Sequence, residues 1–161
     1  MSILTWRSIF TGLIATVILD VLAGAASGLG LTAPLPPNLT GRWFAWVARA
    51  RPFHADIARA GSFAHETAIA VPVHYVIGIT LALIYLSLTA SVGVVPGRLA
   101  PALAFGLSTN VFPWLLMFPA MGYGFFGAQG PEGTRLFVSS LINHACYGIG
   151  LWFGARIMGP S

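Results

Sequence analysis

Three titratable side chains lie inside apolar stretches of the chain that are long enough to cross a membrane. Asp20 interrupts the first stretch, His74 the second and His144 the last. A charged side chain at the centre of a bilayer costs roughly 2.5–3.5 kcal/mol, so ionisable residues at this depth are rarely accidental. A carboxylate and two imidazoles can bind a metal ion, carry a proton or act as a counter-ion. We therefore expect any functional site to include these residues.

A metal site is the first hypothesis for them. His54, His74 and His144 would supply imidazole nitrogens and Asp20 a carboxylate, which suits a divalent zinc- or iron-like ion better than a haem. No spacing among these residues is diagnostic, because neither an HExxH helix nor a Walker loop is present. The single cysteine, Cys146, excludes an intrachain disulfide and a cysteine-based zinc cluster.

Each apolar stretch carries one stripe of small and polar residues at helical spacing. Asp20, His74, Asn110 and His144 lie on these stripes, and Asn143 is adjacent to His144. Such stripes pack against one another because lipid offers no hydrogen bonds. The pattern predicts one polar site within the membrane, formed by Asp20, Arg42, Asn110, Asn143 and His144. Of these residues, Arg42 comes from a loop, and together with His54 it would close the site. In the alternative interpretation these residues only hold the helices together.

Composition identifies the class of protein. The chain has 161 residues, of which 57% are hydrophobic and 7% charged, whereas soluble domains carry about 25% charged residues. Four stretches reach the length of about 20 residues that a spanning helix needs: 8–31, 66–90, 99–126 and 136–158. We predict an all-α integral membrane bundle of four transmembrane helices that forms a single domain over residues 1–161. The first stretch is longer than a signal-peptide core and contains Asp20, so we interpret it as a retained helix.

The long connection over residues 33–65 is the exception to this apolar pattern. It holds four of the eight arginines together with several aromatic residues. Residues 38–50 predict a short amphipathic helix at the membrane interface, capped by Asn38 or Thr40. In a second interpretation this segment folds back over the bundle and brings His54 and Arg42 to the site. In the third stretch, Pro113 and Pro119 predict kinks.

All eight basic residues are arginines, and they lie between or at the edges of the apolar stretches. This placement is typical of membrane flanks and argues against a nucleic-acid partner. The expected partners are the lipid bilayer and either a second copy of the chain or another membrane subunit. Two motifs with small residues four positions apart, GAASG (24–28) and GLWFG (150–154), suit close helix contacts within the bundle or in a dimer. The arginine count, five against three, mildly favours a cytoplasmic long connection.

Six segments follow one another along the chain: GLIATVILD (12–20), GRW (41–43), FHADI (53–57), PVHYVIGI (72–79), FPWLLMFPAMGYGF (112–125) and SLINHACYGIGL (140–151). In these segments the chain resembles the bacterial DUF2938 family of small four-helix membrane proteins of unknown function. The resemblance implies the same residues, Asp20, Arg42, His54, His74 and His144, and adds Pro119 and Arg135. This chain departs from the family pattern at Phe118, where the family usually has Gln. The resemblance implies a bacterial inner-membrane location and supplies no activity.

Three functional hypotheses follow. In the first, the Asp/His site binds a metal or haem and acts on a membrane-soluble substrate. In the second, the protein is a transporter of a small solute or a proton-coupled permease, with Asp20 as the coupling carboxylate. In the third, it is an accessory or assembly subunit of a membrane complex, and its polar stripes are structural.

Overall fold

The computed structural model describes residues 3–159. This part of the chain is helical and contains no strand. Its helices are α1 (Ile3–Gly28), α2 (Pro37–Val47), α3 (Glu66–Ser91), α4 (Leu99–Ser108), the single-turn α5 (Phe118–Ala120) and α6 (Thr134–Ile157). A π-helical segment, Pro113–Met117, lies between α4 and α5. Short 3-10 turns occur at Ile57–Arg59 and Phe125–Gly127.

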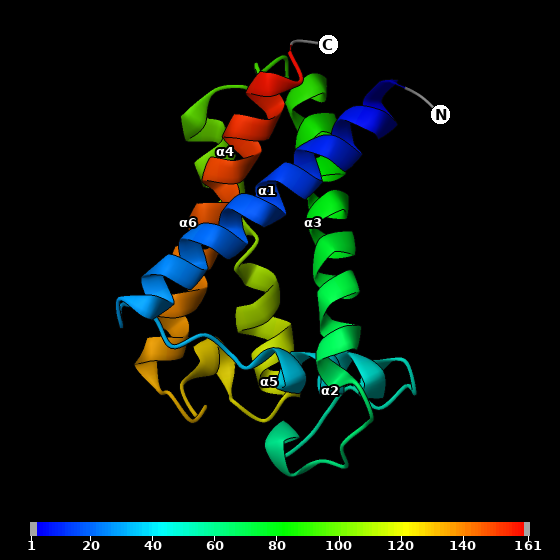
Figure 1. Ribbon diagram of the computed structural model, residues 1–161, viewed down its shortest axis with the longest axis vertical. Coiled ribbons are helices and arrows are strands. Elements are labelled where there is room, and N and C mark those ends of the chain that lie inside the picture. Colours follow the sequence, from blue (N-terminus) through cyan, green and yellow to red (C-terminus); the bar gives the residue numbers. More distant parts are fainter. Residues whose placement is uncertain (1–2, 160–161) are drawn as a thin grey trace.

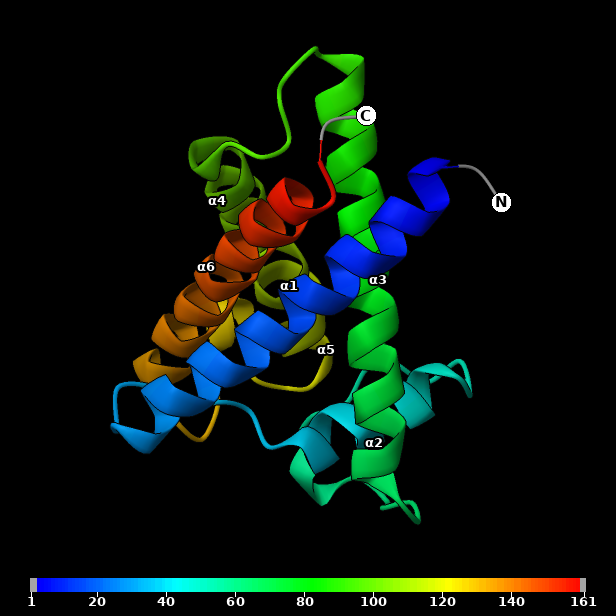
Figure 2. The same ribbon diagram turned by 45° about the horizontal axis from the view of Figure 1, so that its top comes forward.

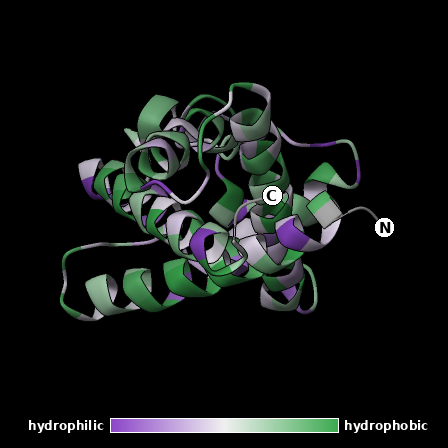
Figure 3. Ribbon diagram, turned by 90° about the horizontal axis from the view of Figure 1, so that it is seen from above, coloured by the Kyte–Doolittle hydropathy of each residue, from purple (hydrophilic) through white to green (hydrophobic). Residues whose placement is uncertain are grey.

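Four helical stretches are long and apolar enough to cross a membrane: Leu4–Gly28, Glu66–Ser91, Leu99–Ala120 and Thr134–Ile157. Apolar residues run along the helices (Figure 3). Many large apolar side chains are exposed. In water this surface would be unfavourable, whereas lipid accommodates it. The all-α bundle of four potential transmembrane helices is therefore confirmed, together with a short helix between the first two.

Glycines set the contacts between the long helices. A Cβ atom on Gly12 of α1 would lie 2.5 Å from the Cα of Ile79 in α3. A Cβ on Gly150 of α6 would lie 2.6 Å from the Cα of Ala15 in α1. Only residues without a side chain allow backbones to approach this closely, and this is how helices pack in lipid. The α1 helix is therefore fixed against both α3 and α6.

The α1 and α3 helices cross near the N-terminal half of α1 and then diverge (Figures 1 and 2). The crossing is fixed by Gly78, because a Cβ added at this position would lie 2.0 Å from Thr16 Oγ1. Beyond it, Gly24 and Gly28 have open space where a side chain would begin. Of the two predicted small-residue motifs, 150–154 therefore packs within the bundle, whereas these two glycines of 24–28 contact no other helix.

The predicted interfacial helix is present, with different ends. It begins at Pro37 after Pro36, with no capping side-chain bond, and ends at Val47 rather than at residue 50. Proline suits this position because the first helical amide needs no partner. Asn38 and Thr40 lie inside the helix, so the prediction that one of them caps it was wrong. The helix lies across the end of the bundle beside the start of α3 (Figure 1). The first transmembrane helix also ends earlier than predicted, at Gly28.

The third membrane stretch was predicted as one kinked helix over 99–126 but is built from three pieces. Helix α4 ends at Ser108, a turn follows at 109–110, and helix α5 begins at Phe118 after the π-helical segment. Pro113 and Pro119 each lack an amide donor, so the hydrogen-bond ladder cannot continue unbroken. The Phe118 amide bonds the Pro113 carbonyl five residues back, which is the π-helical pattern. The polar residues of this stretch therefore lie at a break in a helix.

Candidate functional site

The structure brings Asp20 together with two residues of α3. The Nε2 atom of His74 lies 2.9 Å from Asp20 Oδ1, and the Tyr75 hydroxyl donates to Asp20 Oδ2 at 3.0 Å. Both carboxylate oxygens are thus bonded. An ionised Asp20 can only accept, so Nε2–H donates to it and the neutral imidazole keeps its lone pair on Nδ1, which has no hydrogen-bond partner within residues 3–159. We refer to Asp20, His74 and Tyr75 as the polar triad.

The polar triad is open on one side. The side chains of Asp20 and His74 are 43% and 42% exposed, although both belong to membrane-spanning helices. The cause is the divergence of α1 from α3 just beyond their crossing (Figure 2). A carboxylate facing plain hydrocarbon is costly. The exposed side of the triad therefore needs water, a polar ligand or a partner protein against it.

His144 does not join the polar triad. Its Nδ1 lies 2.6 Å from the hydroxyl of Thr109, which is also 2.6 Å from the Gly106 carbonyl. A hydroxyl has one proton, so when Thr109 donates to Gly106 the His144 Nδ1–H must donate to Thr109. His144 thus ties α6 to the end of α4.

The predicted metal set is not assembled. His74 bonds α1, His144 bonds Thr109, and the ring of His54 lies against Trp46 in the long connection. Across the described residues, no group of three or more His, Cys, Asp or Glu side chains is arranged to hold a metal ion. The sequence could not place these residues relative to one another, because a helical stripe gives the direction of a side chain on one helix but does not specify which neighbour it meets.

Asn110 and Asn143 lie in the polar interface between the third stretch and α6. Asn110 is fully buried and accepts a hydrogen bond of 2.6 Å from the Ser140 hydroxyl. Its amide nitrogen donates to the Leu107 carbonyl at 3.0 Å, which stabilises the break after α4. The buried Oδ1 of Asn143 has no partner among the described residues. Asn110 therefore has a structural role in this arrangement, while Asn143 keeps an acceptor free.

Arg42 bonds Glu66 and not Asp20, contrary to the predicted closure. Its Nε lies 2.7 Å from Glu66 Oε1 and its Nη2 lies 3.1 Å from Oε2, a two-pronged ion pair. Nη1 donates to Ala58 O at 2.9 Å. The hydrogen bond with Glu66 raises the pKa of Arg42. Gly41 makes this possible, since a Cβ there would lie 1.8 Å from the Glu66 carbonyl oxygen. Arg42 thus anchors α2 to the start of α3.

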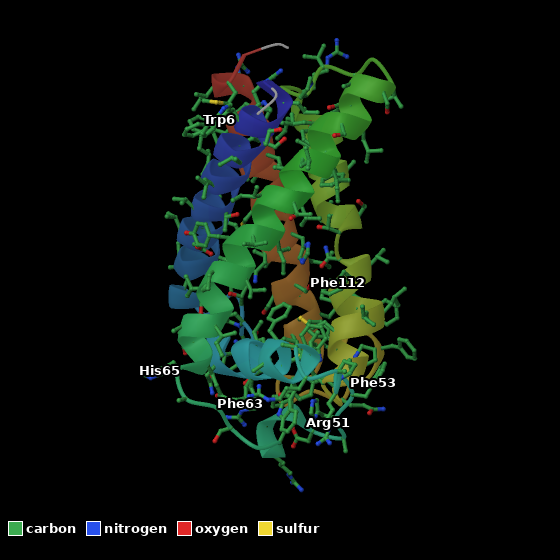
Figure 4. The ribbon with its side chains drawn as sticks, turned by 90° about the vertical axis from the view of Figure 1, so that its right-hand side faces the viewer. Trp6, Arg51, Phe53, Phe63, His65 and Phe112 are labelled. Atoms are coloured by element: carbon green, nitrogen blue, oxygen red, sulfur yellow. The ribbon has the colours of Figure 1, made fainter. Side chains whose placement is uncertain are left out.

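The long connection folds back over the bundle end, as the second interpretation predicted. The amides of His54 and Ile57 donate to the carbonyls of Ala120 and Met121, at 2.8 and 2.9 Å. This strap covers the end of α5 but holds His54 away from the polar triad. The labelled side chains of the connection gather at the end of the molecule opposite Trp6 (Figure 4).

Sequence reasoning missed Tyr75. Neighbouring residues of a helix do not share a face, and so Tyr75 was not grouped with His74. Asp20 receives one bond from each because it lies between them. The two residues added by resemblance lie elsewhere: Pro119 is the second residue of α5, and Arg135 donates to Gly30 O at 3.3 Å. Phe118 is buried in the apolar cluster under α2.

Comparison with known proteins gives a family without an activity. Neither the curated proteins nor the solved structures searched include a match to this chain. The model of the family DUF2938, described as a protein of unknown function, matches residues 9–158, and the chain therefore belongs to this family.

Proposed function

We propose that this protein binds the polar group of a membrane-soluble molecule at Asp20, His74 and Tyr75, and that the triad exchanges a proton with this group. The observation that carries the proposal is the half-exposed, hydrogen-bonded carboxylate and imidazole within membrane-spanning helices. A pair that served only to join α1 to α3 would gain from being sealed, since water and ligand contribute nothing to that role.

The chemistry assigns a role to each side chain. Asp20 fixes the imidazole orientation through Nε2, so Nδ1 can accept a proton or a hydrogen bond from a ligand. Tyr75 holds the second carboxylate oxygen and keeps Asp20 in place. A proton taken up by this pair can reside on the His74 imidazole or on the Asp20 carboxylate, since the two bonded atoms lie 2.9 Å apart. A ligand hydroxyl, amine or carbonyl on an apolar body fits this arrangement.

The same proposal places the protein in the inner membrane of a bacterium. Its support is the four apolar helices, together with the bacterial inner-membrane location that the resemblance implies. Outer-membrane spans are β-barrels, whereas helical bundles are typical of inner membranes.

A hydrophobic carbodiimide tests whether Asp20 can be reached and protonated from the membrane. Such reagents partition into lipid and modify protonated carboxyl groups. We expect dicyclohexylcarbodiimide to label Asp20 in the intact protein in nanodiscs, and the label to increase as the pH falls, with the site assigned by peptide mass spectrometry. Glu66 is the internal control, because its carboxylate is buried against Arg42. A label that persists in Asp20→Asn, or no label on Asp20 from about pH 5 to 8, contradicts the proposal.

The ligand can be sought by extraction. Organic extracts of the purified protein and of Asp20→Asn, compared by mass spectrometry, should differ by an amphiphile retained only by the former. His74→Gln keeps a polar group but cannot hold the added proton, so we expect it to bind the amphiphile weakly. Tyr75→Phe should lose less of the bound amphiphile than His74→Gln, because the phenol only orients Asp20. Identical extracts from all four proteins would leave the triad without a ligand-binding role.

An assembly role is the second candidate, favoured by the open space at Gly24 and Gly28. These glycines continue the α1 face that bears Asp20 and could receive a helix of another subunit. In this case Gly24→Leu should release a partner during gentle solubilisation, while Leu22→Ala on the same helix should not. If native mass spectrometry finds the same assembly in both variants, a partner helix is not bound at Gly24.

A further inference from the structure

A wide-open surface pocket of about 460 Å³, called the cavity below, lies in the long connection, away from the polar triad. Its lining includes Trp46, Arg51, Phe53 and His54. Arg51 and Phe53 lie near one another at the end of the molecule that carries α2 (Figure 4). The cavity thus combines a guanidinium, an imidazole and two aromatic rings.

Arg51 is the arginine of this connection whose charge is not used by the fold. Arg42 pairs with Glu66, and Arg59 pairs with Asp56 at 3.3 Å. Arg49 donates to the Ala45 carbonyl and lies over the Phe63 ring. The exposed Arg51 side chain makes no ion pair or hydrogen bond with any residue from 3 to 159. Its backbone is nevertheless fixed, because its amide donates to the Trp46 carbonyl at 3.0 Å.

His54 also has unused hydrogen-bonding capacity. Its ring lies 5.5 Å from the Trp46 ring, centre to centre, and its amide is fixed on Ala120. Neither ring nitrogen bonds another described residue; Nε2 is buried, whereas Nδ1 is not. Nδ1 is therefore the ring atom that a ligand in the cavity can reach. The imidazole is therefore positioned without a protein partner that explains it.

The position of the cavity indicates the depth of its occupant. It adjoins α2, next to the point where the α3 span begins at Glu66. Phe53 is 73% exposed, and Trp46 packs edge-on against Phe63. Aromatic and arginine side chains together are typical of the level of lipid headgroups. The neighbouring carboxylates of Asp56 and Glu66 are already paired with arginines, so the free charge at the cavity is positive.

We infer that this cavity binds an anionic phosphate group at the membrane interface, with Arg51 as the main contact and His54 as a second donor. Guanidinium and imidazole are donors that phosphate oxygens accept readily. The headgroup of an anionic phospholipid and a free phosphate compound share this chemistry. The exposed Phe53 beside the cavity would contact the acyl region of the former.

Native mass spectrometry of the intact protein in detergent, with added phosphatidylglycerol or phosphatidylcholine, tests the inference. We expect phosphatidylglycerol to be retained preferentially and Arg51→Gln to weaken its binding about tenfold, the loss of one charge-assisted hydrogen bond. Arg59→Gln is the matched control, because it removes an equal charge from the same connection; we expect a change of about twofold or less. His54→Phe keeps the ring packing and should weaken binding as well.

Glycerol phosphate and inorganic phosphate form the second arm, followed by the line width of phosphorus NMR. Binding of these soluble compounds as tight as that of the lipid would support the phosphate site and assign it to a free ligand. Equal losses in Arg51→Gln and Arg59→Gln would overturn the inference, as would equal retention of the two lipids. Since Arg51 is exposed and makes no bond within the described protein, its variant should elute as the parent does in size-exclusion chromatography.

Discussion

Replacing Glu66 with alanine should lower the free energy of unfolding by about 3–5 kcal/mol, the loss expected when a buried charge loses its partner. The side chains of Arg42 and Glu66 are only 11% and 7% exposed, so water cannot replace the lost carboxylate effectively. The Phe63 amide, which donates to Glu66 Oε1 at 2.9 Å, loses its acceptor as well. Reversible unfolding in mixed micelles, followed by circular dichroism, measures the effect.

Arg59→Ala is the control for this prediction. It breaks the ion pair with Asp56, whose side chains are 90% and 37% exposed, and should cost under about 1 kcal/mol. The double variant Arg42→Met with Glu66→Met should recover much of the lost stability, because no charge is then left unpaired. If Glu66→Ala unfolds with the same free energy as Arg59→Ala, the pair does not anchor α2 to α3.

Hydropathy and helical spacing were sufficient to predict the four spans and the interfacial helix. A spanning helix satisfies its own backbone, so length and apolar content alone identify it. Ends were less predictable, since local chemistry decides them: Pro37 set the start of α2, and two prolines divided the third stretch. The π-helical pattern could not be predicted, because kinks at proline can take several hydrogen-bond registers.

The candidate site was predictable in part. The cost of ionisable groups in lipid singled out Asp20 and His74, and the structure pairs them. The same argument singled out His144, but it could not identify Thr109 as its partner, because that contact depends on how α4 and α6 rotate against each other. Arg42 was expected to close the site from the long connection. The close contact of Gly41 with the Glu66 backbone decides the pairing of Arg42 with Glu66, and the spacing of residues in the sequence does not predict this contact.

Gly106→Ala should test the contact that places His144. A Cβ at Gly106 would lie 2.6 Å from the His144 carbonyl oxygen and 2.7 Å from the Gly148 Cα. Both obstacles are backbone atoms, which cannot rotate away, so α4 and α6 must separate. We expect a loss of unfolding free energy at the upper end of the range of about 1–3 kcal/mol for overpacked cores. Unfolding in mixed micelles measures the loss.

The same substitution should change the environment of His144, because Thr109 lies three residues after Gly106 and moves with it. Nitrogen NMR of labelled histidine should show the Nδ1 resonance of His144 shifting, while that of His74, held by Asp20 on other helices, should stay in place. Gly24→Ala is the matched control: it adds the same methyl group to a membrane helix at a point where no other described segment lies within 4 Å of the new Cβ. This variant should be neutral or slightly stabilised, since alanine favours helix over glycine by about 1 kcal/mol. Equal stabilities of the two variants would show that the glycine contact does not fix α4 against α6, and His144 would then be held by its hydrogen bond to Thr109 alone.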